Sequence, residues 1–274
     1  MKPKQILSAE YIKSISYTDF VGLINQWNVL PGAYVTLSKW VKFSNLNSNS
    51  KILEIACTTG FTSREIALAT GCSGLGLDIS EASVKMAKYN KKTYAPNIDI
   101  EYICKDGYKF ESKDKYTHII FGAALRFFSN PEKMIKKSLE FLIDGGILLS
   151  SEFYVVKPIP KELINKAKKI FNFTPTEIPY KEVMKMYQGL DIVYEDKNSL
   201  FKETPEELQY YCKSTVDRAC KMLNIADKKI SKAIFDRLYE IKEMSNELRP
   251  YQNFNVLITR YRKSIYPNRY VELF

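Results

Sequence analysis

Histidine is almost absent from this sequence: His118 is the single histidine among 274 residues. One histidine excludes a His-rich metal site and any mechanism that needs two imidazoles. The five cysteines are an odd number, and no pair has the Cys-x-x-Cys spacing. A zinc site or a disulfide framework is therefore not expected, and a reducing compartment fits this cysteine usage. We predict that the protein binds no metal.

Long apolar runs are also missing. No stretch approaches the roughly 18 apolar residues that a transmembrane helix needs, so no membrane span is expected. The first residues, Met1–Glu10, lack the apolar segment and small-residue cleavage site of a secretory signal. Together these features predict a cytoplasmic protein.

The charge balance is basic, with a formal net charge of +10 at neutral pH. The excess is spread along the chain, and no segment forms a basic arm or block. Nucleic-acid footprints are normally clustered, so we interpret the lysines as a solvated surface and do not expect a nucleic-acid partner.

A polar run, Asn45–Asn49, separates an N-terminal helical region from a chain that alternates between strand and helix patterns. The N-terminal region has two helical stretches, Tyr17–Trp27 and Thr36–Phe43. After the polar run, five apolar strands are predicted: Lys51–Ala56, Leu75–Asp78, Asp99–Cys104, Tyr116–Phe121 and Ile147–Val156. The helices between them are predicted over Ser63–Ala69, Glu81–Tyr94 and Pro131–Leu142. This alternation indicates a parallel sheet with helices on both faces.

The remainder of the chain contains more helix than strand. Helices are predicted over Lys161–Phe171, Tyr180–Gln188, Pro205–Leu223 and Lys228–Leu248, and strands over Asp191–Tyr194 and Asn253–Arg262. We divide the chain into an N-terminal helical cap (residues 1–48), a core (49–201), a helical insertion (202–250), and a last strand with a tail (251–274).

The stretch Lys51–Ser63 carries the clearest chemical signal. It is an apolar strand ending in an acid, Glu54, followed by a turn of small residues that leads into a helix. In open α/β sheets the first strand–helix turn lies where ligands bind, and small residues let the backbone approach a ligand closely. The second strand ends in Asp78, a position from which a carboxylate accepts both hydroxyl protons of a ribose. The third strand is followed by Asp106.

Over roughly Lys51–Glu152 the chain resembles the class I (Rossmann-like) S-adenosylmethionine-dependent methyltransferases. The family's acid–x–Gly–x–Gly–x–Gly motif places its acid on Glu54 and its last glycine on Gly60, while its first two glycines fall on Ala56 and Thr58. The resemblance implies a doubly wound, mostly parallel seven-stranded sheet with an antiparallel last strand. It also implies that Asp78 holds the ribose hydroxyls, that Asp106 hydrogen-bonds the adenine amino group, and that Ala123 lines the sulfonium. Ile79 and Gly107, next to the two acids, are further residues expected to bind the cofactor.

Ala56 and Thr58 depart from the family pattern and leave a non-methylating S-adenosylmethionine-binding relative as an alternative. A nicotinamide-dependent dehydrogenase shares the first two features of the motif. It would normally show Gly-x-Gly-x-x-Gly, which this loop lacks.

Residues that act on the methyl acceptor are less clearly marked. Glu152 and Tyr154 follow the core of the fifth strand, and Arg126 follows the fourth; each is a candidate for a catalytic or substrate-binding role. Arg126 could pair with a carboxylate or phosphate, or lie on the surface. Tyr34, in the aromatic N-terminal segment, is a candidate for contact with the cofactor. For His118, inside an apolar strand, we expect a buried, hydrogen-bonded side chain.

These features predict methyl transfer from S-adenosylmethionine to a small-molecule acceptor, and a lipid-like molecule is one option for that acceptor. A methyltransferase acting on RNA or protein is a further alternative. The insertion between Pro205 and Leu248 is expected beside the active site, where its helices would help to roof a substrate cavity or form a homodimer contact.

Overall fold

The computed structural model describes residues 7–27 and 30–268. The sequence interpretations of residues 1–48 and 251–274 therefore fall partly outside the described residues. No helix in the described ranges is long and apolar enough to cross a membrane. Within the same ranges, no three His, Cys, Asp or Glu side chains are grouped to hold a metal ion.

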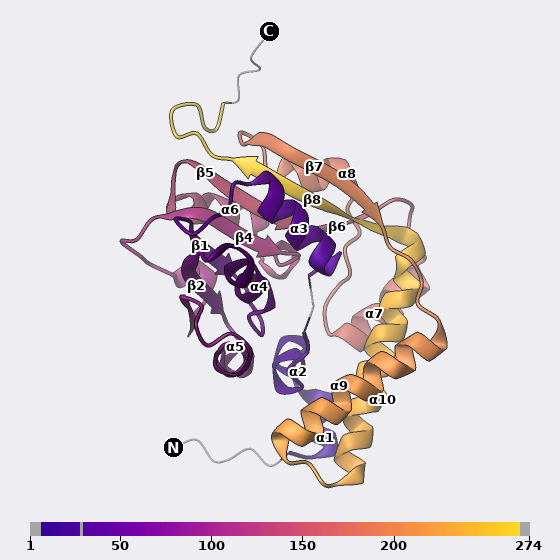
Figure 1. Cartoon of the computed structure of the whole chain (residues 1–274). Helices are drawn as coiled ribbons and strands as arrows, with labels where there is room; N and C mark the ends of the chain where they lie inside the picture. Colours follow the sequence, from indigo (N-terminus) through magenta and orange to yellow (C-terminus); the bar gives the residue numbers. More distant parts are fainter. Residues whose placement is uncertain (1–6, 28–29, 269–274) are drawn as a thin grey trace.

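The described chain forms one mixed sheet whose strand order is β3-β2-β1-β4-β5-β8-β6, with β7 on the free edge of β8 (Figure 1). The strands are β1 (Lys51–Ile55), β2 (Ser73–Asp78), β3 (Ile100–Cys104), β4 (Tyr116–Gly122), β5 (Leu142–Ser151), β6 (Phe153–Val155), β7 (Asp191–Ser199) and β8 (Gln252–Arg260). β1 to β5 are parallel, and β8 runs antiparallel to its neighbours. The predicted fold class is confirmed.

Eight strands replace the predicted seven because the fifth is interrupted at one residue, Glu152. β5 and β6 pair with β8 in one continuous register, from Ile147 opposite Arg260 to Val155 opposite Gln252. At the interruption, Asn255 bonds both backbone groups of Glu152: its N–H donates to the carbonyl, and its side-chain oxygen accepts from the Glu152 N–H. β5 and β6 are therefore two parts of one strand, which is interrupted at Glu152.

Most helices of the core and its N-terminal segment begin and end near the predicted residues, but the helix Ala9–Ser14 was not predicted and the helix that begins at Tyr17 ends at Leu23 instead of Trp27. The helices are α1 (Ala9–Ser14), α2 (Tyr17–Leu23), α3 (Ala33–Phe43), α4 (Phe61–Thr70), α5 (Glu81–Tyr94) and α6 (Pro131–Leu139), with short 3-10 turns η1 (Gly107–Lys109) and η2 (Leu125–Phe127). α5 begins after Ser80, whose hydroxyl accepts from the Ser83 N–H as a cap. α6 ends three residues earlier than predicted, because Leu142 already pairs with Tyr116 in the sheet.

The later helices are α7 (Lys161–Phe171), α8 (Tyr180–Lys185), α9 (Pro205–Leu223), α10 (Lys228–Leu248) and the turn η3 (Arg249–Tyr251). The predicted bounds of α5, α7, α9 and α10 are confirmed. β7 continues to Ser199, beyond the predicted Tyr194, because it pairs with β8 along nearly its whole length. Its outward positions are polar, so the sequence beyond Tyr194 carries little apolar signal.

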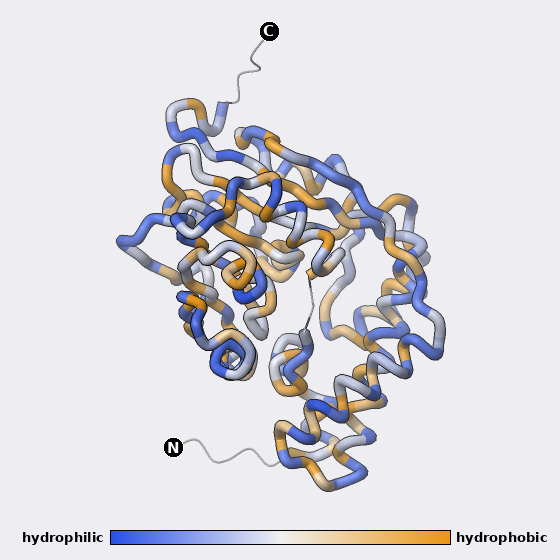
Figure 2. The backbone as a smooth tube through the Cα atoms, viewed as in Figure 1, coloured by the Kyte–Doolittle hydropathy of each residue, from blue (hydrophilic) through white to orange (hydrophobic). Residues whose placement is uncertain are grey.

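Buried side chains form three clusters. Two lie on the two faces of the sheet, around Phe121 and around Trp40. The third joins α1, α2, α7, α9 and α10 away from the sheet, with Phe20, Ile234 and Leu238 at its centre. In Figure 2, hydrophobic and hydrophilic residues alternate along α9 and α10, as expected for helices that bury one face.

Candidate functional site

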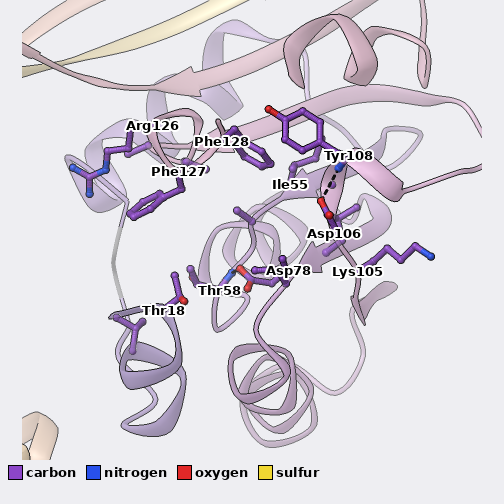
Figure 3. Close-up of a pocket in the computed structure, with 18 of the residues that line it drawn as sticks. Thr18, Ile55, Thr58, Asp78, Lys105, Asp106, Tyr108, Arg126, Phe127 and Phe128 are labelled. Carbon is purple, nitrogen blue, oxygen red and sulfur yellow. Dashed lines mark hydrogen bonds between the residues drawn. The ribbon is translucent and has the colours of Figure 1, made fainter. Parts of the chain in front are cut away.

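A cavity of about 360 Å³ lies at the carboxyl ends of the parallel strands β1 to β4. Its walls also come from α2 and from the segment around η2 (Figure 3). Seven of the residues predicted to bind the cofactor line it: Ala56, Thr58, Asp78, Ile79, Asp106, Gly107 and Ala123. These residues come together because parallel strands place all their carboxyl ends at one edge of the sheet.

Asp78 is the buried carboxylate of this cavity, with 4% of its surface exposed. One oxygen accepts from the Thr58 N–H at 2.9 Å and the other from the Ser80 N–H at 2.8 Å. Burial raises the pKa of Asp78, while the two N–H donors oppose that rise. Each oxygen keeps a further acceptor position. The side chain is thus held in place by backbone and is still able to accept from hydroxyl groups of a ligand.

The loop after β1 has a left-handed backbone at three positions: Ala56 at φ 61°, Thr58 at φ 47° and Gly60 at φ 73°. Only the last is a glycine, the residue that adopts this conformation at no steric cost. The loop therefore keeps a glycine-type shape in spite of two larger residues, and Thr58 still directs its N–H at Asp78.

Glu54 and Gly60 do not line the cavity but support this loop through contacts on its other side. Glu54 is buried, and its carboxylate accepts from the Ser63 N–H at 3.0 Å in the first turn of α4. Burial raises the pKa of Glu54 to about 7. Gly60 precedes α4, and a side chain there would collide with the Tyr102 ring.

Asp106 stands at the opposite end of the cavity from α2 (Figure 3). One of its carboxylate oxygens, Oδ1, accepts from the Tyr108 N–H at 2.9 Å, which begins the turn η1. No bond to Oδ2 is found among the described residues, so this oxygen can accept from an amino group of a ligand.

Tyr17, Thr18 and Val21 of α2 form a wall of the cavity that sequence reasoning did not identify. α2 reaches the cavity by packing closely on α5. Gly22 permits this approach, because a Cβ there would come within 2.5 Å of the Ser83 nitrogen. The aromatic character of the N-terminal segment was visible in the sequence, but nothing local distinguished Tyr17 from the other rings.

Tyr34 lies away from the cavity. The residue is 59% exposed; its ring packs edge-on against Phe61, and its hydroxyl donates to Glu65 at 3.4 Å. α3 turns it to the outer side of α4, so we do not include it in the site. Tyr154 also lies outside the cavity lining, in the buried core against Tyr180.

Arg126 lines the cavity, and Glu152 lies buried close behind it. The Glu152 carboxylate accepts from the Leu125 N–H at 3.3 Å, and burial raises its pKa to about 8. The predicted burial of His118 is confirmed: its ring bonds to the Ser44 carbonyl oxygen and the Thr117 hydroxyl, and burial lowers its pKa.

α9 and α10 contribute no residue to the lining of this cavity. They pack against α1 and α2 and form hydrogen bonds to the residues that follow these two helices. Arg218 of α9 donates to the Asn25 carbonyl oxygen at 2.9 Å, and Arg237 of α10 donates to the Ile15 carbonyl oxygen at 2.7 Å.

An open α/β sheet with a tight loop after its first strand and acids at the ends of its second and third strands defines a nucleotide-cofactor-binding protein. A sequence model of the methyltransferase-domain family matches residues 46–211. The chain belongs to this family, the class I S-adenosylmethionine-dependent methyltransferases, whose cofactor is S-adenosylmethionine.

Individual known proteins are similar to parts of this chain in sequence or to most of it in fold. A carboxy-S-adenosyl-L-methionine synthase from Campylobacter fetus is 32% identical over 39% of this chain and 46% of its own length. The chain spans about half the length of the curated relatives it matches. The crystal structure of MccD protein superposes with a TM-score of 0.70 at 26% identity, covering 86% of this chain and 100% of that one.

A methyltransferase from Geobacter sulfurreducens in complex with S-adenosyl-L-homocysteine superposes with a TM-score of 0.68 at 18% identity. This superposition covers 90% of this chain and 99% of that one, and at this identity it shows the shared fold.

Proposed function

We propose that this protein transfers the methyl group of S-adenosylmethionine to a small-molecule acceptor that enters the cavity from the α2 and η2 side. The observation that carries the proposal is the cavity at the strand ends, with Asp78 and Asp106 placed along it. Asp78 would accept from the ribose hydroxyls and Asp106 from the adenine amino group. Ala123, whose backbone is left-handed at φ 59°, would border the sulfonium.

The residues present fit this cofactor. Asp78 keeps acceptor positions beyond its two backbone donors, and Asp106 keeps one oxygen without a partner among the described residues. The small side chains of Ala56 and Ala123 leave room above the strand ends. When bound, the sulfonium supplies an already activated methyl group, so the chain's part is to orient the two reactants and to exclude water.

The protein needs a general base only if the methyl acceptor has to lose a proton when it attacks the methyl group. Glu152 is the buried carboxyl that could serve as such a base. However, it bonds to the Leu125 N–H, beside Arg126, and is not part of the cavity lining. We therefore assign it no catalytic step.

Calorimetric titration with S-adenosylmethionine and S-adenosyl-L-homocysteine tests the cofactor site. Wild-type protein should bind both, and Asp78→Ala should weaken binding about tenfold or more, because it removes a charged acceptor of two hydroxyl groups. Asp99→Ala, which removes an exposed acid away from the cavity, is the matched control. A folded wild-type protein that binds neither compound would disprove the proposal.

A second candidate is a reaction that uses S-adenosylmethionine without releasing its methyl group. The similarity to a carboxy-S-adenosyl-L-methionine synthase favours it. Mass spectrometry of the cofactor after turnover separates the two, since methyl transfer leaves S-adenosyl-L-homocysteine. For an RNA or protein acceptor we would expect clustered basic residues at the cavity, and its described lining contains two, Lys105 and Arg126.

A further inference from the structure

Arg126 lies at the end of the cavity opposite Asp106. It is carried by η2, the short turn that follows β4. In Figure 3, Arg126 and Phe127 occupy one side of the cavity, while Asp106, Lys105 and Tyr108 occupy the other. Asp78 and Asp106 would hold the cofactor. The methyl acceptor therefore has to approach from the side of the cavity where Arg126 lies.

The Arg126 guanidinium is surrounded by aromatic rings from three different segments. Its central carbon lies 4.8 Å from the Phe127 ring centre, 5.0 Å from that of Phe173 and 5.2 Å from that of Phe153. Tyr17 of α2 extends this aromatic surface by packing on Phe127 and Phe173. The rings hold the cation in place and exclude water, which strengthens its attraction for an anion.

None of the described residues accepts a hydrogen bond from the five N–H groups of Arg126. Across the described ranges it makes no hydrogen bond and no ion pair, and its Nε is fully buried without a partner. The neighbouring carboxyl, Glu152, is instead bonded to the Leu125 N–H. Buried polar groups in native proteins are nearly always paired, and an unpaired one calls for a partner that the chain itself does not supply.

We propose that Arg126 binds an oxyanion, a carboxylate or a phosphate, on the molecule that accepts the transferred group. The planar guanidinium matches such oxyanions through two parallel hydrogen bonds. The rings of Phe127 and Tyr17 would contact the apolar part of the same molecule. This inference rests on the proposed function and narrows the acceptor to an anionic small molecule with an apolar or planar body.

The test uses protein saturated with S-adenosyl-L-homocysteine and three probes that share one phenyl ring: benzoate, phenyl phosphate and benzamide. Calorimetry or ligand-observed NMR gives their affinities. At least one anion should bind about tenfold more tightly than neutral benzamide, and Arg126→Gln should remove this difference. Which anion binds better distinguishes a carboxylate from a phosphate acceptor. Arg260→Gln, the same change at the exposed last residue of β8, should leave the difference intact.

The competing ligand for Arg126 is the carboxylate of the cofactor itself. Comparison of S-adenosyl-L-homocysteine with 5′-methylthioadenosine, which lacks that carboxylate, separates the two cases. Arg126→Gln should leave both affinities within about twofold of wild type. A loss confined to S-adenosyl-L-homocysteine would overturn the inference, as would anions that bind the loaded protein no better than benzamide. A wild-type protein that does not bind S-adenosyl-L-homocysteine would instead refute the proposed function.

Discussion

Ala56 and Thr58 hold a backbone conformation that L-residues rarely adopt, at φ 61° and 47°. Left-handed backbone costs a residue with a side chain roughly 1–2 kcal/mol, which the surrounding contacts must offset. Here the Thr58 N–H donates to Asp78, and the Cys57 N–H donates to the Leu77 carbonyl oxygen. The strain is therefore located in the loop that borders the proposed cofactor.

Replacing Ala56 by glycine should relieve part of this strain. We expect Ala56→Gly to stabilise the protein by about 0.5–1 kcal/mol, because strain relief exceeds the extra chain entropy that glycine gives the unfolded state. The free energy of unfolding in urea measures the effect. Ala69→Gly makes the same change in the helix α4, where it should destabilise by up to about 1 kcal/mol. A loss of stability at both positions would show that Ala56 is not strained.

At the scale of elements, the cavity is completed by α2, and α2 depends on helices that are distant in sequence. Arg237 of α10 donates to the carbonyl oxygens of Ile12 and Ile15 at the end of α1, and its guanidinium lies 4.4 Å from the Phe20 ring centre of α2. α10 thereby holds both the end of α1 and the helix α2, which forms a wall of the cavity.

Arg237→Met should loosen this segment without unfolding the sheet. Two carbonyl groups would lose a charged donor, at a cost of about 2 kcal/mol. We expect faster amide hydrogen exchange across α1 and α2 and weaker binding of S-adenosyl-L-homocysteine, with exchange in β1 and β4 unchanged. Lys232→Met, on the exposed face of the same helix, is the control. Faster exchange throughout the sheet would indicate that α10 supports the whole fold and not α2 in particular.

At the scale of the whole molecule, two buried carboxyls set a pH dependence of stability. Burial raises the pKa of Glu54 to about 7 and that of Glu152 to about 8, against an ordinary value of 4.5. Between pH 4.5 and these values the folded state keeps protons that the unfolded chain releases. Stability should therefore be greatest at acidic pH and decrease as the pH rises toward 8.

Glu152→Gln removes one of these carboxyls and keeps an oxygen to accept from the Leu125 N–H. Without ligand, wild-type protein should lose on the order of 3 kcal/mol through Glu152 between pH 5 and pH 8, and the variant should lose correspondingly less. Urea unfolding at the two pH values measures both. Exposed Glu101→Gln should keep the wild-type dependence. An unchanged slope in Glu152→Gln would mean that Glu152 is ionised in the folded protein.

Local residue patterns were enough to predict most strands and helices in their order along the chain, and the acids that follow the strands. The short stretches rich in apolar residues that end near Ile55, Leu77 and Ile103 predicted strands, and each is followed directly by small or polar residues typical of loops. Local caps such as Ser80 and Thr204 then begin helices at definite residues. The placement of Asp78 and Asp106 in one cavity followed from these local signals, because parallel strands end at a common edge.

Local patterns did not predict which residues cover that edge of the sheet, because the cover is formed by segments distant in sequence. Tyr17 lines the cavity and Tyr34 does not, although both are aromatic residues of the N-terminal segment. The interruption of the fifth strand at Glu152 depends on Asn255, 103 residues away in the chain. The rings that enclose the guanidinium of Arg126 come from three segments of the chain, and two of these segments are distant from it in sequence. Burial and pairing depend on contacts between distant parts of the chain, and local residue patterns do not contain them.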